Sequence, residues 1–269
     1  MPLITSQKIS RYFELFSNVE VSFNKEVVKA IKLNPTQIFL KCLGEQWPCV
    51  IFSTSLLGAK VVVSMKSEMF EKVRKANNLV SLRFSFKQVD KSNELSFFVS
   101  SKITGFNSYN KGNPDLNFVN LSYTQRPPDD LISILGQLLE ATINAKKRNE
   151  NRILLTADNI KKLGLKSKNG IFYVQNVPRN CIIRDLSFSG AKIIVVGVPK
   201  FLVKKEVILK IESFDRATME VPGNILRFEQ VEGRKDLAAI AINYAQDKIP
   251  VEYKMMINEF IESNKKFNE

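Results

Sequence analysis

Two arginines and a short polar run that follows them are the residues in this sequence best suited to chemistry. Arg148 and Arg152 are separated by three residues, so on a turn or short extended loop both guanidinium groups can converge on one planar anionic ligand. A guanidinium pairs through two parallel hydrogen bonds with phosphate oxygens or with a guanine edge, and its plane stacks on bases. The pair therefore indicates a site for a phosphate-bearing ligand.

The run Asp185-Leu186-Ser187-Phe188-Ser189-Gly190 lies downstream of Arg152 and supplies complementary chemistry. The Asp185 carboxylate can accept hydrogen bonds from the N–H groups of a guanine, and the Ser187 hydroxyl can donate or accept. Gly190 lets a backbone approach closely because it has no Cβ. Arginines for phosphate and a carboxylate for guanine together indicate a guanine nucleotide.

The order R-x-x-x-R followed by D-x-S-x-x-G resembles the PilZ family of cyclic di-GMP receptors, and the two-part layout resembles a spirochaetal member of that family. Taken singly, the arginines also fit a solvated basic loop, and the polar run fits a turn between strands. The resemblance implies a receptor without enzymatic activity or cofactor on a small β-barrel, with cyclic di-GMP as the ligand. The residues that match the family's ligand positions are Arg148, Arg152, Asp185, Ser187 and Gly190, and the secondary candidates are Lys147, Asn149, Arg184 and Ser189. A basic residue at position 147 implies two stacked ligand molecules per chain.

Charge and composition favour anionic partners and disfavour catalysis. Forty Lys and Arg against 27 Asp and Glu give a net charge of +13, which suits nucleotides, DNA, RNA or acidic membranes without choosing among them. The chain has no histidine, which removes the usual general base, the Ser-His-Asp triad and most zinc sites. We therefore expect neither an enzyme nor a metal site.

The cysteines and the apolar runs bear on location. Cys42, Cys49 and Cys181 are odd in number and lack C-x-x-C spacing, so they are expected to be buried thiols in a reducing compartment. Charged residues interrupt the N-terminal stretch from Met1 to Phe16, and no apolar run approaches the roughly 20 residues of a membrane span. The sequence predicts a cytoplasmic monomer without a transmembrane segment.

An internal repeat organises the chain. When Cys49 is placed on Cys181, the stretch Cys49–Val63 aligns without a gap on Cys181–Val195, and at the same offset Phe23 aligns with Leu155 upstream. Chance similarity between two β-rich stretches is the alternative. The repeat predicts two mainly β domains, each a Greek-key or split β-barrel followed by an amphipathic helix: a degenerate PilZ-like domain over residues 1–140 and a PilZ domain over residues 141–269.

Both halves are predicted to end in the same way, with two strands and then a helix. The expected strands are 97–104 and 116–123 in the first half and 223–229 and 237–245 in the second. Pro127 and Pro128 stop the first sheet, and apolar residues at helical spacing predict a helix that runs to Lys146. A second amphipathic helix begins near Tyr253.

The two copies differ where the ligand chemistry should be. In the first copy Ser53 replaces the aspartate, and Phe16 and Glu20 replace the two arginines, whereas Ser55 and Gly58 keep the serine and the glycine. The first copy is therefore expected to serve as a scaffold, or as a surface for a protein partner.

The arginine pair follows the helix that closes the first half, so it is also predicted to be a hinge. We expect both arginines to be solvated when the hinge is open and paired with phosphates when it is closed, so that binding changes the domain arrangement and downstream interactions. The alternative function is a basic nucleic-acid-binding regulator whose nucleotide site is regulatory or vestigial.

Overall fold

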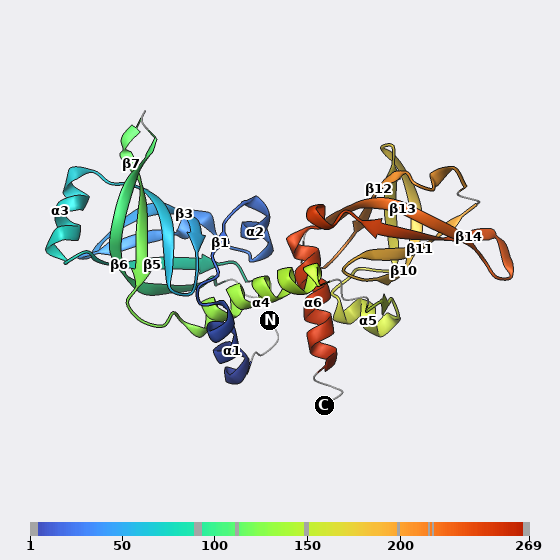
Figure 1. The fold of residues 1–269 in the computed structure, drawn as a ribbon, viewed down its shortest axis with the longest axis horizontal. Coiled ribbons are helices and arrows are strands. Elements are labelled where there is room, and N and C mark those ends of the chain that lie inside the picture. Colours follow the sequence, from blue (N-terminus) through green and yellow to red (C-terminus); the bar gives the residue numbers. More distant parts are fainter. Residues whose placement is uncertain are drawn as a thin grey trace. The chain divides into compact units, whose positions relative to one another are not determined.

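The computed structural model describes residues 5–88, 93–110, 113–147, 151–197, 200–214, 216 and 218–265. The chain divides into two compact units, Met1–Leu139 and Glu140–Glu269. Each unit is built on one antiparallel sheet, drawn from blue to green in the first unit and from yellow to red in the second (Figure 1).

In the first unit the described residues form a closed six-stranded barrel. Its strand order is β3–β2–β5–β6–β7–β4, with β4 pairing back to β3, and the short strand β1 pairs with β3 at the side. The strands are β1 (Val21–Ser22), β2 (Phe39–Cys42), β3 (Glu45–Thr54), β4 (Gly58–Ser64), β5 (Leu79–Phe86), β6 (Leu95–Asn110) and β7 (Asn113–Tyr123).

Helices accompany this first barrel. Helix α1 (Ser6–Phe16) starts at Thr5, whose side chain accepts a hydrogen bond from the Lys8 amide. One side of α1 is apolar and buried, at Ile9, Tyr12 and Phe16. The other helical segments are α2 (Lys25–Ala30), the short 3₁₀ turn η1 (Pro35–Gln37), α3 (Ser67–Lys75) and α4 (Asp129–Lys146), of which α4 begins in the first unit and ends in the second.

The second unit repeats the architecture. Its described residues close a barrel in the order β11–β14–β13–β12–β9–β10, with β10 pairing back to β11 and the short strand β8 pairing with β10. The strands are β8 (Ile153–Leu154), β9 (Asn169–Val174), β10 (Val177–Leu186), β11 (Gly190–Val196), β12 (Glu206–Ile211), β13 (Met219–Val231) and β14 (Arg234–Tyr244). The helical segments are α5 (Ala157–Lys162), η2 (Lys200–Leu202), η3 (Gln246–Lys248) and α6 (Val251–Lys265).

Strand register confirms the internal repeat. Val21 lies opposite Thr54 in the first barrel, and Ile153 lies opposite Leu186 in the second, so both pairs keep the offset that places Cys49 on Cys181. The same offset relates α2 to α5, each a six-residue helix capped by the side chain just before it. The repeat is therefore structural and reaches upstream of the aligned strands.

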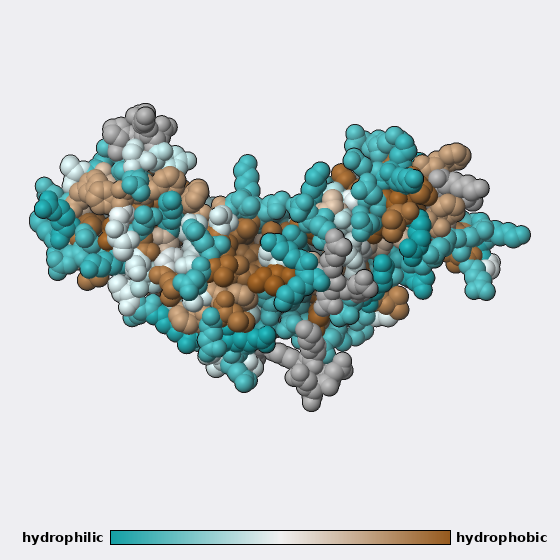
Figure 2. Space-filling view, viewed as in Figure 1, coloured by the Kyte–Doolittle hydropathy of each residue, from teal (hydrophilic) through white to brown (hydrophobic). Residues whose placement is uncertain are grey.

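The inward side chains are apolar in both barrels. In β10 and β11 the inward residues alternate with exposed or half-buried ones, and Ile183, Leu186 and Ile193 are almost fully buried. On the visible face of each unit, hydrophilic side chains predominate, with smaller hydrophobic patches between them (Figure 2).

All three cysteines are free and buried, as the sequence predicts. Burial raises the pKa of the Cys49 and Cys181 thiols to about 12. These thiols are therefore protonated at neutral pH and are poor nucleophiles.

The predicted strands lie inside observed ones, except that 237–245 extends one residue past the end of β14, and the helix expected to end at Lys146 does end there. The sequence did not predict α1, α2, α3 or α5. No helix in the described part of the chain is long and apolar enough to cross a membrane.

Candidate functional site

An ion pair joins the two parts of the sequence motif. The Nη1 atom of Arg152 lies 2.7 Å from Oδ1 of Asp185, and the Arg152 side chain is 52% exposed whereas that of Asp185 is 11% exposed. The contact arises because β8 begins directly after Arg152 and pairs with β10, which places Leu154 opposite Asp185. The sequence predicts a solvated Arg152 for the open hinge; here the Arg152 side chain is about half exposed and is also paired with this carboxylate.

A β-bulge precedes the carboxylate. The register between β10 and β11 shifts between Ile183 and Asp185, so that Arg184 is the extra residue, and its side chain is exposed. Bulges re-aim side chains and are frequent next to functional sites. Here the bulge exposes Arg184 while the next side chain, Asp185, turns toward Arg152 and is largely buried.

Ser187 serves the turn between β10 and β11. Its amide donates to the Gly190 carbonyl at 2.9 Å, and its hydroxyl contacts that carbonyl at 3.0 Å and accepts from the Gly190 amide at 3.1 Å. The residue is almost fully buried. The sequence allowed a hydroxyl directed at a ligand, whereas the observed partners lie within the turn. Ser189 is half-buried, with its hydroxyl 3.4 Å from that of Ser187.

Gly190 lies against the neighbouring strand. A Cβ at this position would overlap the carbonyl oxygen of Ile242 in β14, which pairs with β11. The close backbone approach predicted from this glycine therefore exists, and the approaching backbone is that of the protein itself.

Two tyrosines that the motif did not reveal lie beneath the turn. The Tyr253 hydroxyl of α6 donates to the Ser187 carbonyl at 2.8 Å and lies 3.3 Å from the Tyr244 hydroxyl. Burial raises the pKa of both phenols, so both keep their protons at neutral pH and can donate. The sequence carried one signal for Tyr244: the last strand of each half ends in a tyrosine, Tyr123 in the first half and Tyr244 in the second.

We expect Tyr253→Phe to lower the free energy of unfolding of the second unit by about 1–3 kcal/mol, because the buried Ser187 carbonyl loses its donor. Urea denaturation followed by circular dichroism measures the loss. Tyr109→Phe removes a hydroxyl from a side chain that is 48% exposed and is the matched control, with little expected change. Equal stability of wild type and Tyr253→Phe would show that this hydrogen bond contributes nothing to the turn.

The first barrel carries the same geometry with different chemistry. Glu20 and Ser53, the counterparts of Arg152 and Asp185, also contact each other, through a hydrogen bond from the Ser53 hydroxyl to the Glu20 carboxylate. The β3–β4 bulge likewise falls between Ile51 and Ser53. A Cβ on Gly58 would overlap a carbonyl oxygen, as at Gly190. The scaffold is thus duplicated, while the guanidinium and the aspartate are confined to the second barrel.

The remaining candidates separate into described and undescribed residues. Arg148 and Asn149 lie outside the described residues. Lys147 is exposed just after α4. No cluster of three or more potential metal ligands occurs within the described ranges of the chain.

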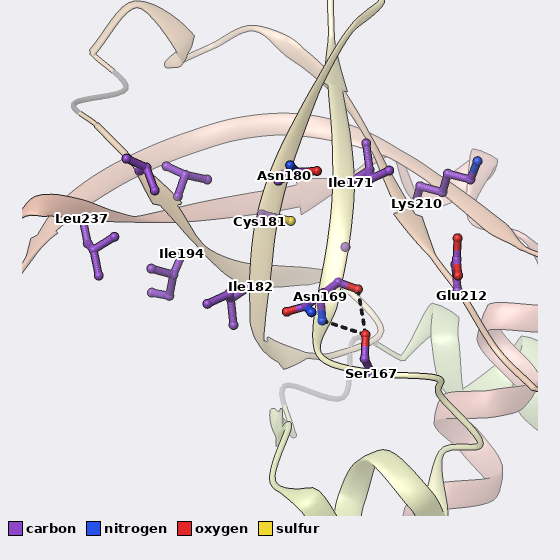
Figure 3. A pocket seen from close by; sticks show the side chains of 13 residues that line it. Ser167, Asn169, Ile171, Asn180, Cys181, Ile182, Ile194, Lys210, Glu212 and Leu237 are labelled. Atoms are coloured by element: carbon purple, nitrogen blue, oxygen red, sulfur yellow. Dashed lines mark hydrogen bonds between the residues drawn. The ribbon is translucent and has the colours of Figure 1, made fainter.

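A cavity of about 490 Å³ opens on the outside of the second barrel (Figure 3). Ile182, Ile194 and Leu237 form its apolar wall, and Lys210 and Glu212 lie at another edge. Neither Arg152 nor Asp185 is among its described lining residues. The cavity therefore does not supply the phosphate and guanine chemistry of the motif.

Comparison with known proteins assigns the family. Residues 7–142 match the model of the PilZN3 domain, and residues 147–262 match that of the PilZ domain. The chain is 45% identical over 261 residues to the "Cyclic di-GMP binding protein" of Treponema denticola, covering 97% of this chain and 83% of that protein. The chain therefore belongs to the PilZ-domain family, as its motifs predicted.

Solved structures with similarity include the Borreliella burgdorferi PlzA protein in complex with c-di-GMP, at 22% identity and a TM-score of 0.43, over 95% of this chain and 98% of that one. Another is the Bacillus subtilis inhibitor of motility MotI/DgrA, at 12% identity and a TM-score of 0.31, over 86% of this chain and 97% of that one.

Proposed function

We propose that this protein is a cyclic di-GMP receptor whose ligand binds the second barrel. The observation that carries the proposal is the ion pair between Arg152, from the R-x-x-x-R motif, and Asp185, from the D-x-S-x-x-G motif. The name of the Treponema denticola relative supports the choice of ligand.

The site works by holding its charged groups before the ligand arrives. Arg152 turns to a phosphate of the ligand, and Asp185 accepts hydrogen bonds from the guanine N–H groups. Because the Arg152 side chain is about half exposed, its guanidinium is accessible to a phosphate, while the guanine N–H groups replace it as partners of the Asp185 carboxylate. Ser187 and Gly190 act through the turn that positions Asp185, and Arg148 supplies the second phosphate contact.

The secondary candidates surround this centre. Arg184 stands exposed on the bulge beside Asp185, and Lys147 stands exposed before the arginine pair. Added to Arg148 and Arg152, the Lys147 charge suits four phosphates better than two, which supports two ligand molecules per chain. Asn149 and Ser189 complete the proposed set.

The two domains of the receptor, residues 1–140 and residues 141–269, have different roles. The first barrel has Glu20 and Ser53 in place of the ligand groups, so it does not bind cyclic di-GMP by this route. It instead offers a surface to a protein partner, and ligand binding beside the segment that joins the domains changes their arrangement. The receptor acts as a monomer in the cytoplasm, without enzymatic activity.

One titration with two readouts tests the proposal. Calorimetry with cyclic di-GMP should show binding with a stoichiometry near two, and small-angle scattering at the same ligand ratios should change as the site fills. No heat with cyclic di-GMP would overturn the assignment of the ligand. Binding with an unchanged scattering curve would retain the receptor and overturn the domain rearrangement.

A further inference from the structure

We propose that the outer surface of β2, β5 and β6 in the first barrel binds single-stranded nucleic acid. This surface, the aromatic face, is defined by the outward residues Phe39, Lys41, Ser81, Arg83, Phe98, Ser100 and Lys102. The residues between them, such as Leu40, Leu82 and Val99, point inward and are almost fully buried. The proposal concerns the first barrel and does not rest on cyclic di-GMP binding by the second.

Register places aromatic and cationic side chains in one row. Phe39 lies opposite Arg83, and Arg83 lies opposite Phe98, so the three stand side by side across three strands. The Arg83 guanidinium carbon is 5.8 Å from the centre of the Phe39 ring, and the Lys41 Nζ is 5.4 Å from the centre of the Phe98 ring. Phe98 remains 42% exposed.

Small polar residues lie beside this row. Ser81 faces Lys41 on one side and Ser100 on the other, and Lys102 follows Ser100 on the same side of β6. Serines leave the taller phenylalanine rings and cations standing above the sheet. A flat ring beside a cation matches a base beside its phosphate, because the base stacks and the phosphate pairs.

The face carries positive charge only. The segments Phe39–Cys42, Leu79–Phe86 and Leu95–Asn110 contain three cations at outward positions, Lys41, Arg83 and Lys102, and no Asp or Glu. Two carboxylates lie near its edges. Glu45 pairs with Lys72, and Glu94 accepts hydrogen bonds from Ser85 and Asn34. These hydrogen bonds, and the nearby Arg83 charge, lower the pKa of Glu94.

The second barrel lacks this combination at the equivalent strands. Ile171 takes the place of Phe39, and Lys210 takes the place of Arg83. Lys210 faces Glu220 on the next strand, where the first barrel has Phe98 facing Arg83. The aromatic face is therefore specific to the first barrel and does not follow from the shared fold.

The side chains of the aromatic face indicate which class of ligand it binds. Two of the three cations are lysines, which are depleted in the cores of protein interfaces, and the face has no acids, so it suits a polyanion better than a protein. Side chains standing on a sheet cannot stack on bases already paired within a duplex, whereas unpaired bases can lie on them. A single strand of RNA or DNA meets both requirements.

The test measures fluorescence anisotropy of labelled single strands on the full-length protein. The probes are oligouridine and oligothymidine of about 12 nucleotides, a length within the usual site size of small β-barrels. Phe98→Leu, which keeps an apolar side chain but removes the ring, should weaken binding about 5- to 100-fold. Arg83→Gln should also lower the slope of log affinity against log salt by about 0.7.

Lys210→Gln is the matched control, because it removes one charge at the equivalent place in the second barrel, and little change is expected. Tighter binding of RNA than DNA would identify contacts to the 2′-hydroxyl, and equal affinities would identify stacking and charge alone; either supports the face. Any of three results would overturn it: wild-type affinity in Phe98→Leu, equal losses in Arg83→Gln and Lys210→Gln, or displacement of the strands by an acidic peptide as readily as by unlabelled oligomer. Cyclic di-GMP titration of the same variants should be unchanged, which separates this proposal from the proposed receptor function.

Discussion

The double variant Arg148→Ala, Arg152→Ala is expected to lose cyclic di-GMP binding, with each arginine removing about 1.5–3 kcal/mol of charge-assisted hydrogen bonding. Together the two losses weaken affinity by about 10²- to 10⁴-fold, since each 1.4 kcal/mol is a factor of ten. Asp185→Ala alone should remove one such contact, to the guanine. Calorimetry on the purified wild type, the double variant and Asp185→Ala measures the three affinities.

Ser53→Ala is the matched control, because it alters the same scaffold position in the first barrel. Its hydroxyl bonds to Glu20 and takes no part in the proposed ligand site, so affinity should stay near that of the wild type. Tight binding by the double arginine variant would refute the site assignment. A large loss in Ser53→Ala would show that the first barrel contacts the ligand directly.

Because of the ion pair, the stability of each variant must be known as well as its affinity. Removal of Arg152 leaves the largely buried Asp185 carboxylate without its cation, so Arg152→Ala should also destabilise the second barrel. The thermal stability of each variant must therefore be measured beside its affinity. A variant that is folded at the titration temperature and yet does not bind has lost the contact, since its scaffold is intact.

The sequence was informative about the fold because the ungapped match of Cys49–Val63 to Cys181–Val195 exposed the duplication. The helix ending at Lys146 followed from prolines and apolar spacing, and the final helix followed from residues such as Tyr253. Helix α1 was missed although its buried residues Ile9, Tyr12 and Phe16 stand at helical spacing, with only three charged residues in the helix. Helix α3 buries still fewer residues, Met69 and Val73, and it is only nine residues long.

The candidate site was predicted in its residue types and only partly in its geometry. Motif spacing pointed to Arg152 and Asp185, and the pairing of β8 with β10 explains why they meet. Their direct contact could not be foreseen, because it depends on a bulge at Arg184 and on strand register. The contribution of Tyr253 was also hidden, since it lies far from Ser187 in the sequence and only tertiary packing joins them.

Roles inside the D-x-S-x-x-G motif divide more clearly in the structure than in the sequence. Asp185 carries the charge, whereas Ser187 closes the turn and Gly190 allows the backbone of β14 to pack closely against β11. The first barrel shows the same division: it keeps Ser55 and Gly58 but has Ser53 at the position of the aspartate. Residues that both barrels share serve the fold, whereas the proposed ligand contacts are residues confined to the second barrel.

Gly190→Ala is accordingly expected to destabilise the second unit by about 3 kcal/mol or more, at the upper end of the usual cost of overpacking. The added methyl group would overlap the Ile242 carbonyl oxygen, and that carbonyl cannot retreat without disturbing the pairing of β11 with β14. Such a loss is a large fraction of the roughly 5–15 kcal/mol that stabilises a domain. Urea denaturation followed by circular dichroism measures it.

Gly58→Ala should have a matching effect on the first unit, because its methyl group would overlap the Leu121 carbonyl oxygen in the same way. Trp47, the one tryptophan of the sequence, reports unfolding of that unit by fluorescence. Gly105→Ala is the control within a strand, since the nearest atom to its methyl group is the Asn120 Nδ2 at 3.7 Å. If Gly190→Ala abolished cyclic di-GMP binding at unchanged stability, and Gly58→Ala were harmless, Gly190 would serve the approach of the ligand, and its assignment to strand packing would be wrong.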